Sequence, residues 1–263
     1  MKLENRVIIV TGGARDIGKA ISLKLASEGA KVAINYFGSE QGAKETLAEI
    51  EAAGGSAFTL QGDMTKQADV EALVKKAQDT FGSNEVHGLV NVAGGLLARK
   101  TVEEMDLEHF NKVIQLNLNS TFLTTKVVSP LMKEGAAIVN LASQAGRDGG
   151  GPGSSAYAAS KGAVITFTRS MAKELGPKGI RVNSLCPGMI STLFHDTFTK
   201  DEVRSNVANM TPLRREGGAT EVADAVSYLC GDESTFIHGT NICLLYTSPS
   251  PRDLSTSRMP SSA

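Results

Sequence analysis

The sequence VTGGARDIGKA, residues 10–20, begins at the last residue of the apolar run Val7–Val10. It places glycines between a predicted strand and a predicted helix. Glycines at such a junction allow a tight turn, and the N–H groups at the following helix N-terminus favour an anion such as a pyrophosphate. Glycine-rich turns also occur for structural reasons, so this stretch alone leaves both interpretations open. Asp16 stands where a further glycine is expected. We interpret it as a helix N-cap that accepts hydrogen bonds from the N–H of Gly18 or Lys19.

The rest of the chain alternates strand-like apolar runs with segments of helical period, which is typical of repeated βαβ units. The predicted strands are residues 6–10, 31–36, 56–61, 87–91, 136–142, 179–185 and 240–245. The predicted helices lie near residues 17–28, 39–53, 66–81, 103–133, 155–176 and 218–230. Right-handed crossovers then predict an α/β fold, a doubly wound parallel sheet with helices on both faces and ligands at the carboxyl ends of the strands.

Composition limits the classes of function. The chain has 263 residues, of which 41% are hydrophobic, enough for one large α/β domain. Its net charge is −1 and no basic block occurs, so we predict a small soluble ligand and no nucleic-acid or membrane partner. The three cysteines lack metal-ligand spacing, which predicts a reduced, cytoplasmic chain without a metal site. No apolar run approaches ~18 residues, so neither a signal peptide nor a membrane span is expected.

The end of the chain differs in composition from the rest. Residues 246–263 are rich in serine, proline and threonine, with few apolar side chains to anchor them. Such composition predicts disorder, and the abrupt change suggests that this tail is non-native sequence read through from a vector or adaptor. We therefore assign residues 1–245 to one domain.

Two hydroxyl side chains and one ammonium group are candidates for chemistry on a carbonyl. Tyr157 and Lys161 lie four residues apart and so share a helix face, where the cation would lower the phenol pKa from ~10. A phenol tuned in this way can donate a proton, although an exposed helix pair without function is the alternative. Ser143 ends a predicted strand, and its hydroxyl could meet that of Tyr157 on one carbonyl oxygen. Polar residues near the same sheet edge are Asp63, Asn91 and Asn117.

These motifs resemble the short-chain dehydrogenase/reductase family in order and nearly in spacing, over residues 1 to about 244. The matching elements are Thr11–Gly18, Asp63, the NVAG stretch from Asn91 to Gly94, Asn117, Ser143, the YAASK stretch from Tyr157 to Lys161, and Pro187-Gly188. The resemblance implies a single Rossmann-type domain of about seven strands, a nicotinamide cofactor, a small-molecule carbonyl substrate and a homotetramer.

The resemblance also implies roles for individual residues. Tyr157 would be the general acid/base, and Lys161 would bind the nicotinamide ribose and lower the Tyr157 pKa. Ser143 would polarise the substrate carbonyl. Asn117 would hold a proton-relay water. The residues expected to contact the cofactor are Gly12, Arg15, Ile17, Gly18, Asn35, Asp63, Asn91, Ala93, Gly94, Tyr157, Lys161, Pro187, Gly188, Ile190 and Thr192.

The stretch from Asn35 to Ser39 lacks the acid that NAD enzymes use to bind the ribose diol, and Arg15 could contact a 2′-phosphate. We therefore expect NADP(H) to be slightly preferred over NAD(H).

The first functional hypothesis is reduction of a small polar carbonyl substrate such as a sugar acid or keto acid. Residues 189–216 resemble the family's substrate lid, and residues 144–154 would form the facing wall. Together they offer Arg147, His195, Arg214 and Arg215, at least one of which could clamp a carboxylate; the alternative is that most of them are solvated lid residues. The alternatives are a 3-oxoacyl-[acyl-carrier-protein] reductase and a catalytically silent nucleotide-binding sensor.

Overall fold

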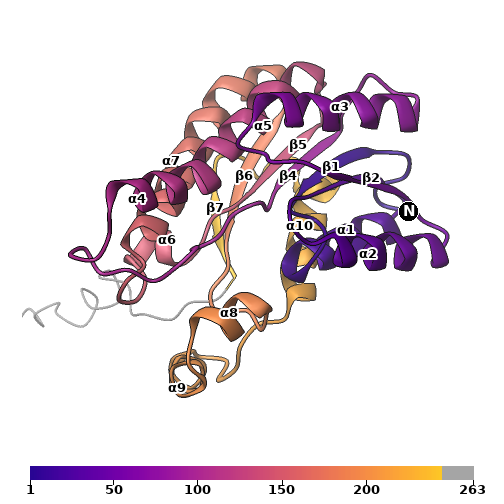
Figure 1. The fold of residues 1–263 in the computed structure, drawn as a ribbon. Helices are drawn as coiled ribbons and strands as arrows, with labels where there is room; N and C mark the ends of the chain where they lie inside the picture. Colours follow the sequence, from indigo (N-terminus) through magenta and orange to yellow (C-terminus); the bar gives the residue numbers. More distant parts are fainter. Residues whose placement is uncertain (245–263) are drawn as a thin grey trace, which may run out of the picture.

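The computed structural model describes residues 1–244, apart from the side chains of Phe194 and His195, so the predicted tail 246–263 lies outside the described residues. Seven strands form one sheet in the order β3-β2-β1-β4-β5-β6-β7, and every neighbouring pair is parallel (Figure 1). The strands are β1 (Val7–Thr11), β2 (Lys31–Tyr36), β3 (Ser56–Gln61), β4 (Gly88–Asn91), β5 (Ala137–Leu141), β6 (Arg181–Cys186) and β7 (Asn241–Cys243). The predicted doubly wound, Rossmann-type sheet is confirmed.

Helices cover both faces of this sheet. The core on one face includes side chains of α1 (Asp16–Ser27), α2 (Glu40–Ala52) and α10 (Ala219–Cys230). The core on the other face includes side chains of α3 (Gln67–Phe81), α5 (Ser120–Val128) and α7 (Ser155–Leu175). The remaining α-helices described are α4 (Leu107–Ile114), α6 (Ala145–Asp148), α8 (Leu193–Phe198) and α9 (Asp201–Met210).

The helix predicted over residues 103–133 is divided. A π-helical turn, Gln115–Asn119, separates α4 from α5, and the chain then continues into a short 3-10 turn, Ser129–Leu131. Asn117 lies within the π-helical turn. Such turns occur often at functional sites because they shift side chains out of the regular helical register.

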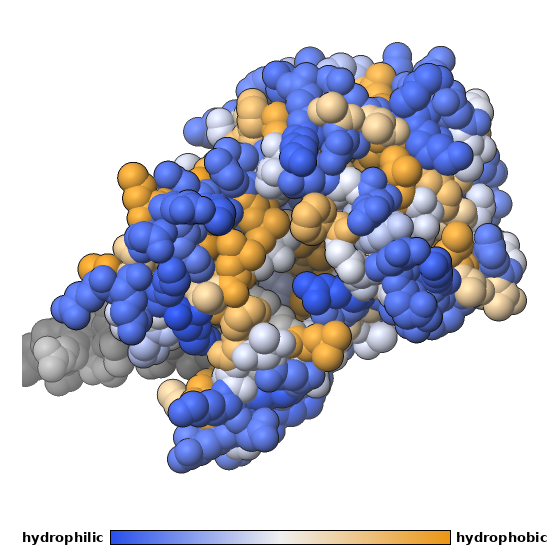
Figure 2. All heavy atoms as spheres, viewed as in Figure 1, coloured by the Kyte–Doolittle hydropathy of each residue, from blue (hydrophilic) through white to orange (hydrophobic). Residues whose placement is uncertain are grey.

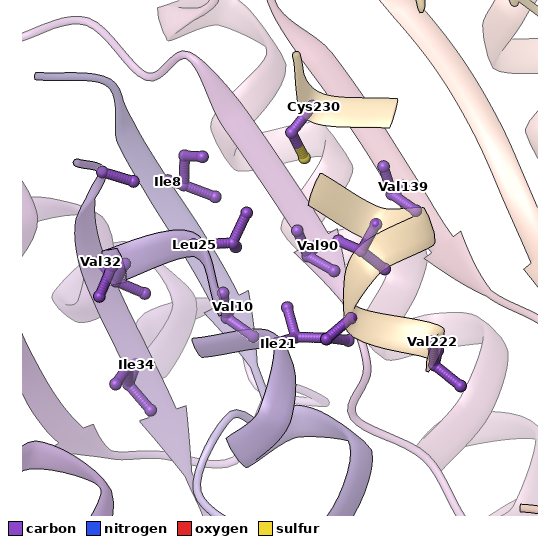
Figure 3. Close-up of a cluster of buried hydrophobic side chains, with 14 of the residues drawn as sticks. Ile8, Val10, Ile21, Leu25, Val32, Ile34, Val90, Val139, Val222 and Cys230 are labelled. Atoms are coloured by element: carbon purple, nitrogen blue, oxygen red, sulfur yellow. The ribbon is translucent and has the colours of Figure 1, made fainter. Parts of the chain in front are cut away.

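The strands β1, β4, β5 and β6 are buried on both faces, which explains their nearly continuous apolar sequence. In β1, Ile8 and Val10 point to the layer of α1 and α10, whereas Ile9 points to the opposite layer. Figure 3 shows Ile8 and Val10 near Ile21 and Leu25 of α1. Each such buried side chain contributes about 1.5–3 kcal/mol relative to exposure, so this alternation fixes the sheet between its helices.

The carboxyl ends of the strands lie at one edge of the sheet. The strand order reverses between β1 and β4, and a crevice is expected outside that point. α8 and α9 lie beyond this edge (Figure 1), and Figure 2 shows the surface hollowed between them and the body. None of the helices described in residues 1–244 combines the length and the hydropathy that a membrane span requires.

Candidate active site

The glycine turn after β1 is held in place by neighbouring strands. Gly12 has φ +63°, and a Cβ there would lie 3.0 Å from the backbone of Ala93. A Cβ on Gly18 would lie 2.0 Å from the carbonyl oxygen of Gly12, so only glycine allows the helix to start this close to the strand. Thr11 Oγ1 accepts the N–H of Ala93 at 3.2 Å, and Asn35 Oδ1 accepts the N–H of Gly12 at 3.2 Å. This narrow backbone cradle fits a pyrophosphate.

Asp16 has a different role from the predicted N-cap. Its φ of +49° lies in the left-handed region, but Arg15 occupies the N-cap position and the N–H of Lys19 bonds to the carbonyl oxygen of Arg15. Because α1 begins at Asp16 itself, the carboxylate lies beside the first turn instead of before it. Asp16 Oδ1 accepts the backbone N–H of Leu193, the first residue of α8, at 3.0 Å. The N-cap prediction is therefore wrong.

Ser143, Tyr157 and Lys161 come together at the carboxyl edge of the sheet. Ser143 follows β5, and its side chain is hydrogen-bonded to Tyr157, near the start of α7. Lys161 is only 5% exposed, and its Nζ donates to the carbonyl oxygen of Leu141 at 2.6 Å. The same Nζ lies 5.8 Å from the centre of the Tyr157 ring. The predicted meeting of the two hydroxyls is confirmed.

Burial controls the protonation of these groups. It lowers the pKa of the Lys161 ammonium to about 8. It also raises the pKa of the Tyr157 phenol above its usual 10, and the hydrogen bond from Ser143 opposes this rise only in part. Desolvation outweighs the hydrogen bond from Ser143 here, and Lys161 Nζ is bonded to Leu141, so the lowering of the phenol pKa by Lys161 stays a prediction. At neutral pH the pair is a protonated phenol beside a charged ammonium.

The side chains of Asn117 and Lys161 both approach Gly94. A Cβ on Gly94 would lie 2.6 Å from Asn117 Oδ1 and 3.1 Å from Lys161 Nζ. The amide of Asn117 binds both backbone groups of Gly95, accepting at 3.0 Å and donating at 2.9 Å, and it also donates to the carbonyl oxygen of Val113. Asn117 thus fixes the chain after β4, and its predicted water-holding role stays a prediction.

Several residues predicted to contact the cofactor have side chains with hydrogen-bond partners in the protein. The buried Asn91 donates to Asn140 Oδ1 at 2.8 Å and accepts from Thr124 Oγ1 at 2.6 Å. Asp63 Oδ1 accepts the N–H and the hydroxyl of Thr65, which is a local turn. The other occupied side chains are those of Asn35, bonded to Gly12 and Gly62, and Thr192, bonded to the carbonyl oxygen of Ile190. These four residues can shape a cofactor site through the backbone that they position.

The remaining predicted cofactor residues border the turn or follow β6. Arg15 exposes 64% of its side chain, and Ile17 packs at the margin of the α1 core. The chain after β6 is fixed by the carbonyl oxygen of Pro187, which accepts the N–H of Gln144 at 3.0 Å. Gly188 follows it, and Ile190 pairs with Gly217.

Three of the four cations predicted to clamp a carboxylate have partners within the protein. Arg215 forms a two-pronged ion pair with Glu221, at 2.7 and 2.6 Å. Arg214 donates to the carbonyl oxygen of Asn209, and Arg147 contacts the thiol of Cys243. The side chain of His195 lies outside the described residues.

Sequence reasoning missed Arg99, which links two segments beside the site. Its Nε donates to the carbonyl oxygen of Phe198 at 2.8 Å, and its Nη1 donates to that of Pro152 at 2.9 Å. Phe198 ends α8, and Pro152 precedes α7. Both acceptors are backbone groups, so no side-chain pattern in the sequence could have identified this residue.

A Rossmann-type sheet that presents a hydroxyl pair beside a pyrophosphate cradle defines the class of dinucleotide-dependent oxidoreductases. The family model described as enoyl-(acyl carrier protein) reductase matches residues 12–244. This chain belongs to the short-chain dehydrogenase/reductase family, whose members use a nicotinamide cofactor. It is an oxidoreductase acting on carbonyl or hydroxyl groups.

Similar proteins carry several names. The 3-oxoacyl-[acyl-carrier-protein] reductase FabG of Staphylococcus aureus strain Mu50 is 38% identical over 240 residues, which cover 89% of this chain and 94% of that protein. The uncharacterized oxidoreductase YgfF of Escherichia coli K12 is 38% identical, with coverages of 90% and 98%. A blue fluorescent protein from a metagenomic library, solved with NADPH, has a TM-score of 0.86 and 30% identity, covering 93% of this chain and 98% of its own.

Proposed function

We propose that this protein is an NADPH-dependent reductase that converts a ketone of a small substrate to an alcohol. The observation that carries the proposal is the hydrogen-bonded pair of Ser143 and Tyr157 beside the buried ammonium of Lys161. Two hydroxyls at one point can hold a carbonyl oxygen, and a protonated phenol can transfer its proton to that oxygen. A silent nucleotide-binding sensor would have no use for this arrangement.

The cradle after β1 is the part of the chain that would hold the cofactor. The backbone of Gly12 to Gly18 and the α1 N-terminus would bind the pyrophosphate, and Lys161 has further N–H groups for a ribose hydroxyl. Gly94 and the chain from Pro187 to Ile190 would line the site. When bound, the dihydronicotinamide supplies the hydride.

Two observations support NADPH over NADH. The residues from Asn35 to Ser39 include no carboxylate, and the exposed Arg15 guanidinium beside the cradle can bind a 2′-phosphate. The metagenomic blue fluorescent protein, which shares this fold, was solved with NADPH.

The proton would move from the Tyr157 hydroxyl to the substrate oxygen. Because the pKa of Tyr157 is raised, the phenol holds its proton at neutral pH until the carbonyl oxygen gains negative charge. Lys161, with a pKa of about 8, is then charged and stabilises the phenolate that remains. Ser143 would hold the oxygen during this transfer, and Asn117 would keep the chain beside Lys161 in place.

The arginines predicted to clamp a carboxylate already have partners in the protein. This favours a neutral ketone over the predicted sugar acid or keto acid as the substrate. A carboxylate would compete with Glu221 for Arg215, and Arg147 and Arg214 are each held by a contact within the protein. The name of the Staphylococcus aureus relative supports the alternative class, a 3-oxoacyl thioester. We therefore propose the thioester as the preferred substrate and the keto acid as the second candidate.

The test compares kcat/KM with NADPH on an acetoacetyl thioester and on a hexulosonate-type ketone, for wild type and Arg147→Ala. We expect the thioester to be the better substrate by about tenfold or more, and Arg147→Ala to leave both rates within about twofold. A better rate on the hexulosonate that is lost in Arg147→Ala would establish the carboxylate clamp and overturn this proposal.

We also propose that the protein assembles as a homotetramer and works in the cytoplasm. Exposed hydrophobic side chains on α4 and α5 support an assembly, namely Leu107, Phe110 and Phe122. Sedimentation equilibrium of the full chain gives the mass in solution, and a monomer at micromolar concentration would contradict the tetramer.

A further inference from the structure

α8 is attached to the body of the protein at both of its ends. At its first residue, the N–H of Leu193 donates to the carboxylate of Asp16 at 3.0 Å. At its last residue, the carbonyl oxygen of Phe198 accepts from Arg99 at 2.8 Å. The two attachment points belong to the cofactor cradle and to the chain after β4. α8 therefore borders the hollow at the carboxyl edge (Figures 1 and 2).

The segment that includes α8 behaves as one unit because Arg204 ties it together. Arg204, on α9, binds the carboxylate of Glu216 with two hydrogen bonds of 2.7 Å and also pairs with Asp196 of α8. Its side chain is only 16% exposed although α9 lies at the surface. Contacts that hold α8 consequently hold the whole segment from residue 191 to residue 216.

The conformation of Asp16 makes its contact with α8 specific. A carboxylate facing a pyrophosphate would be repelled, and the bond to Leu193 directs this carboxylate toward α8. Only glycine, asparagine and aspartate readily adopt the backbone of residue 16, with φ of +49°. Glycine there would keep the turn but supply no acceptor, whereas asparagine would keep both.

We propose that Asp16 is a positioning residue that latches residues 191–216 over the cofactor and substrate, with Arg99 as the second latch. The effect on catalysis rests on the proposed ketone reduction, but the latch itself can be measured without any reaction. Asp16, which stands where a glycine is expected, thus holds residues 191–216 in place and is not needed to form the turn.

Hydrogen exchange followed by mass spectrometry tests the latch directly. In Asp16→Gly, we expect peptides covering residues 191–198 to exchange roughly three- to tenfold faster, as expected for the loss of one ordinary hydrogen bond at a solvent-exposed position. Asp16→Asn should stay within about twofold of wild type, because Asn Oδ1 can still accept the Leu193 N–H. Arg99→Met should accelerate the same peptides from the other end. Unchanged exchange in both Asp16→Gly and Arg99→Met would overturn the proposal.

Kinetics with NADPH and the acetoacetyl thioester provide the second measurement. We expect Asp16→Gly to raise the KM of the ketone roughly three- to tenfold, with NADPH Kd within a few-fold of wild type, and Asp16→Asn to restore KM. A tenfold or greater loss of NADPH affinity in Asp16→Gly, with lid exchange unchanged, would assign Asp16 to the cofactor instead. If no ketone is reduced by wild type, the proposed function fails while the exchange result still decides the latch.

Discussion

The ammonium group of Lys161 donates a 2.6 Å hydrogen bond to the carbonyl oxygen of Leu141, the last residue of β5. This bond attaches α7 to the carboxyl edge of the sheet at the point where Ser143 and Tyr157 meet. An ammonium has three N–H donors, so two remain for the phenolate side of the site and for a ribose. The strand end thus sets the position of the charge that the proposed reaction needs.

The buried Lys161 should make stability depend on pH. Its pKa is about 8 in the folded chain and 10.5 when unfolded, so between these values the unfolded state binds more protons and stability rises with pH. Relative to Lys161→Met, wild type should gain up to about 3 kcal/mol between pH 8 and pH 10.5. Urea unfolding of both proteins at pH 7 to 10 measures this difference. A difference that stays constant, or falls with pH, would contradict the lowered pKa.

Removal of the Tyr157 hydroxyl should abolish most of the activity. Tyr157→Phe keeps the ring but has no proton to donate, so kcat should fall by about 10²–10⁴-fold, while NADPH Kd changes little. Single-turnover rates and a fluorescence titration of NADPH measure the two quantities. Tyr228→Phe, a change on the exposed part of α10, serves as the matched control. Turnover near that of wild type in Tyr157→Phe would remove its assignment as the acid.

Gly18 should tolerate no side chain. In Gly18→Ala the new methyl group would meet the carbonyl oxygen of Gly12, which forces the cradle apart and costs about 1–3 kcal/mol. Gly38→Ala is the matched control, because a Cβ there meets nothing within 4 Å. Thermal unfolding should therefore show a lower Tm for Gly18→Ala alone, accompanied by weaker NADPH binding. Equal Tm values for the two variants would show that the close approach is not required.

Arg15 should determine the preference for NADPH. Its guanidinium is exposed beside the cradle, and a charge-assisted bond to a 2′-phosphate contributes roughly 1.5–3 kcal/mol. Arg15→Ala should lower kcat/KM for NADPH about tenfold or more and leave the value for NADH within about twofold. Steady-state rates with both cofactors measure this. Equal losses with NADPH and NADH would place Arg15 outside the phosphate site.

The sequence by itself determined the sheet and its helices. Apolar periodicity is local, so β2 and β3 begin and end at the predicted residues, and the burial of β2 on both faces follows from its lack of polar alternation. The meeting of Ser143 and Tyr157 was also predictable, because the glycine-rich loop 146–153 can return the chain to the end of the strand that Ser143 follows. These features depend on residues that are near one another in the chain.

Only the tertiary structure decided which partner each polar side chain takes. Asp16 accepts the backbone N–H of Leu193, 177 residues away in the chain. The side chain of Asn91 forms a buried amide–amide hydrogen bond with Asn140. Burial, which depends on the packing of whole helices, sets the pKa of Tyr157 and Lys161 in directions that their spacing does not reveal. Hydrogen bonds between distant segments follow from that packing, because a polar group removed from water bonds to whatever the fold brings within reach.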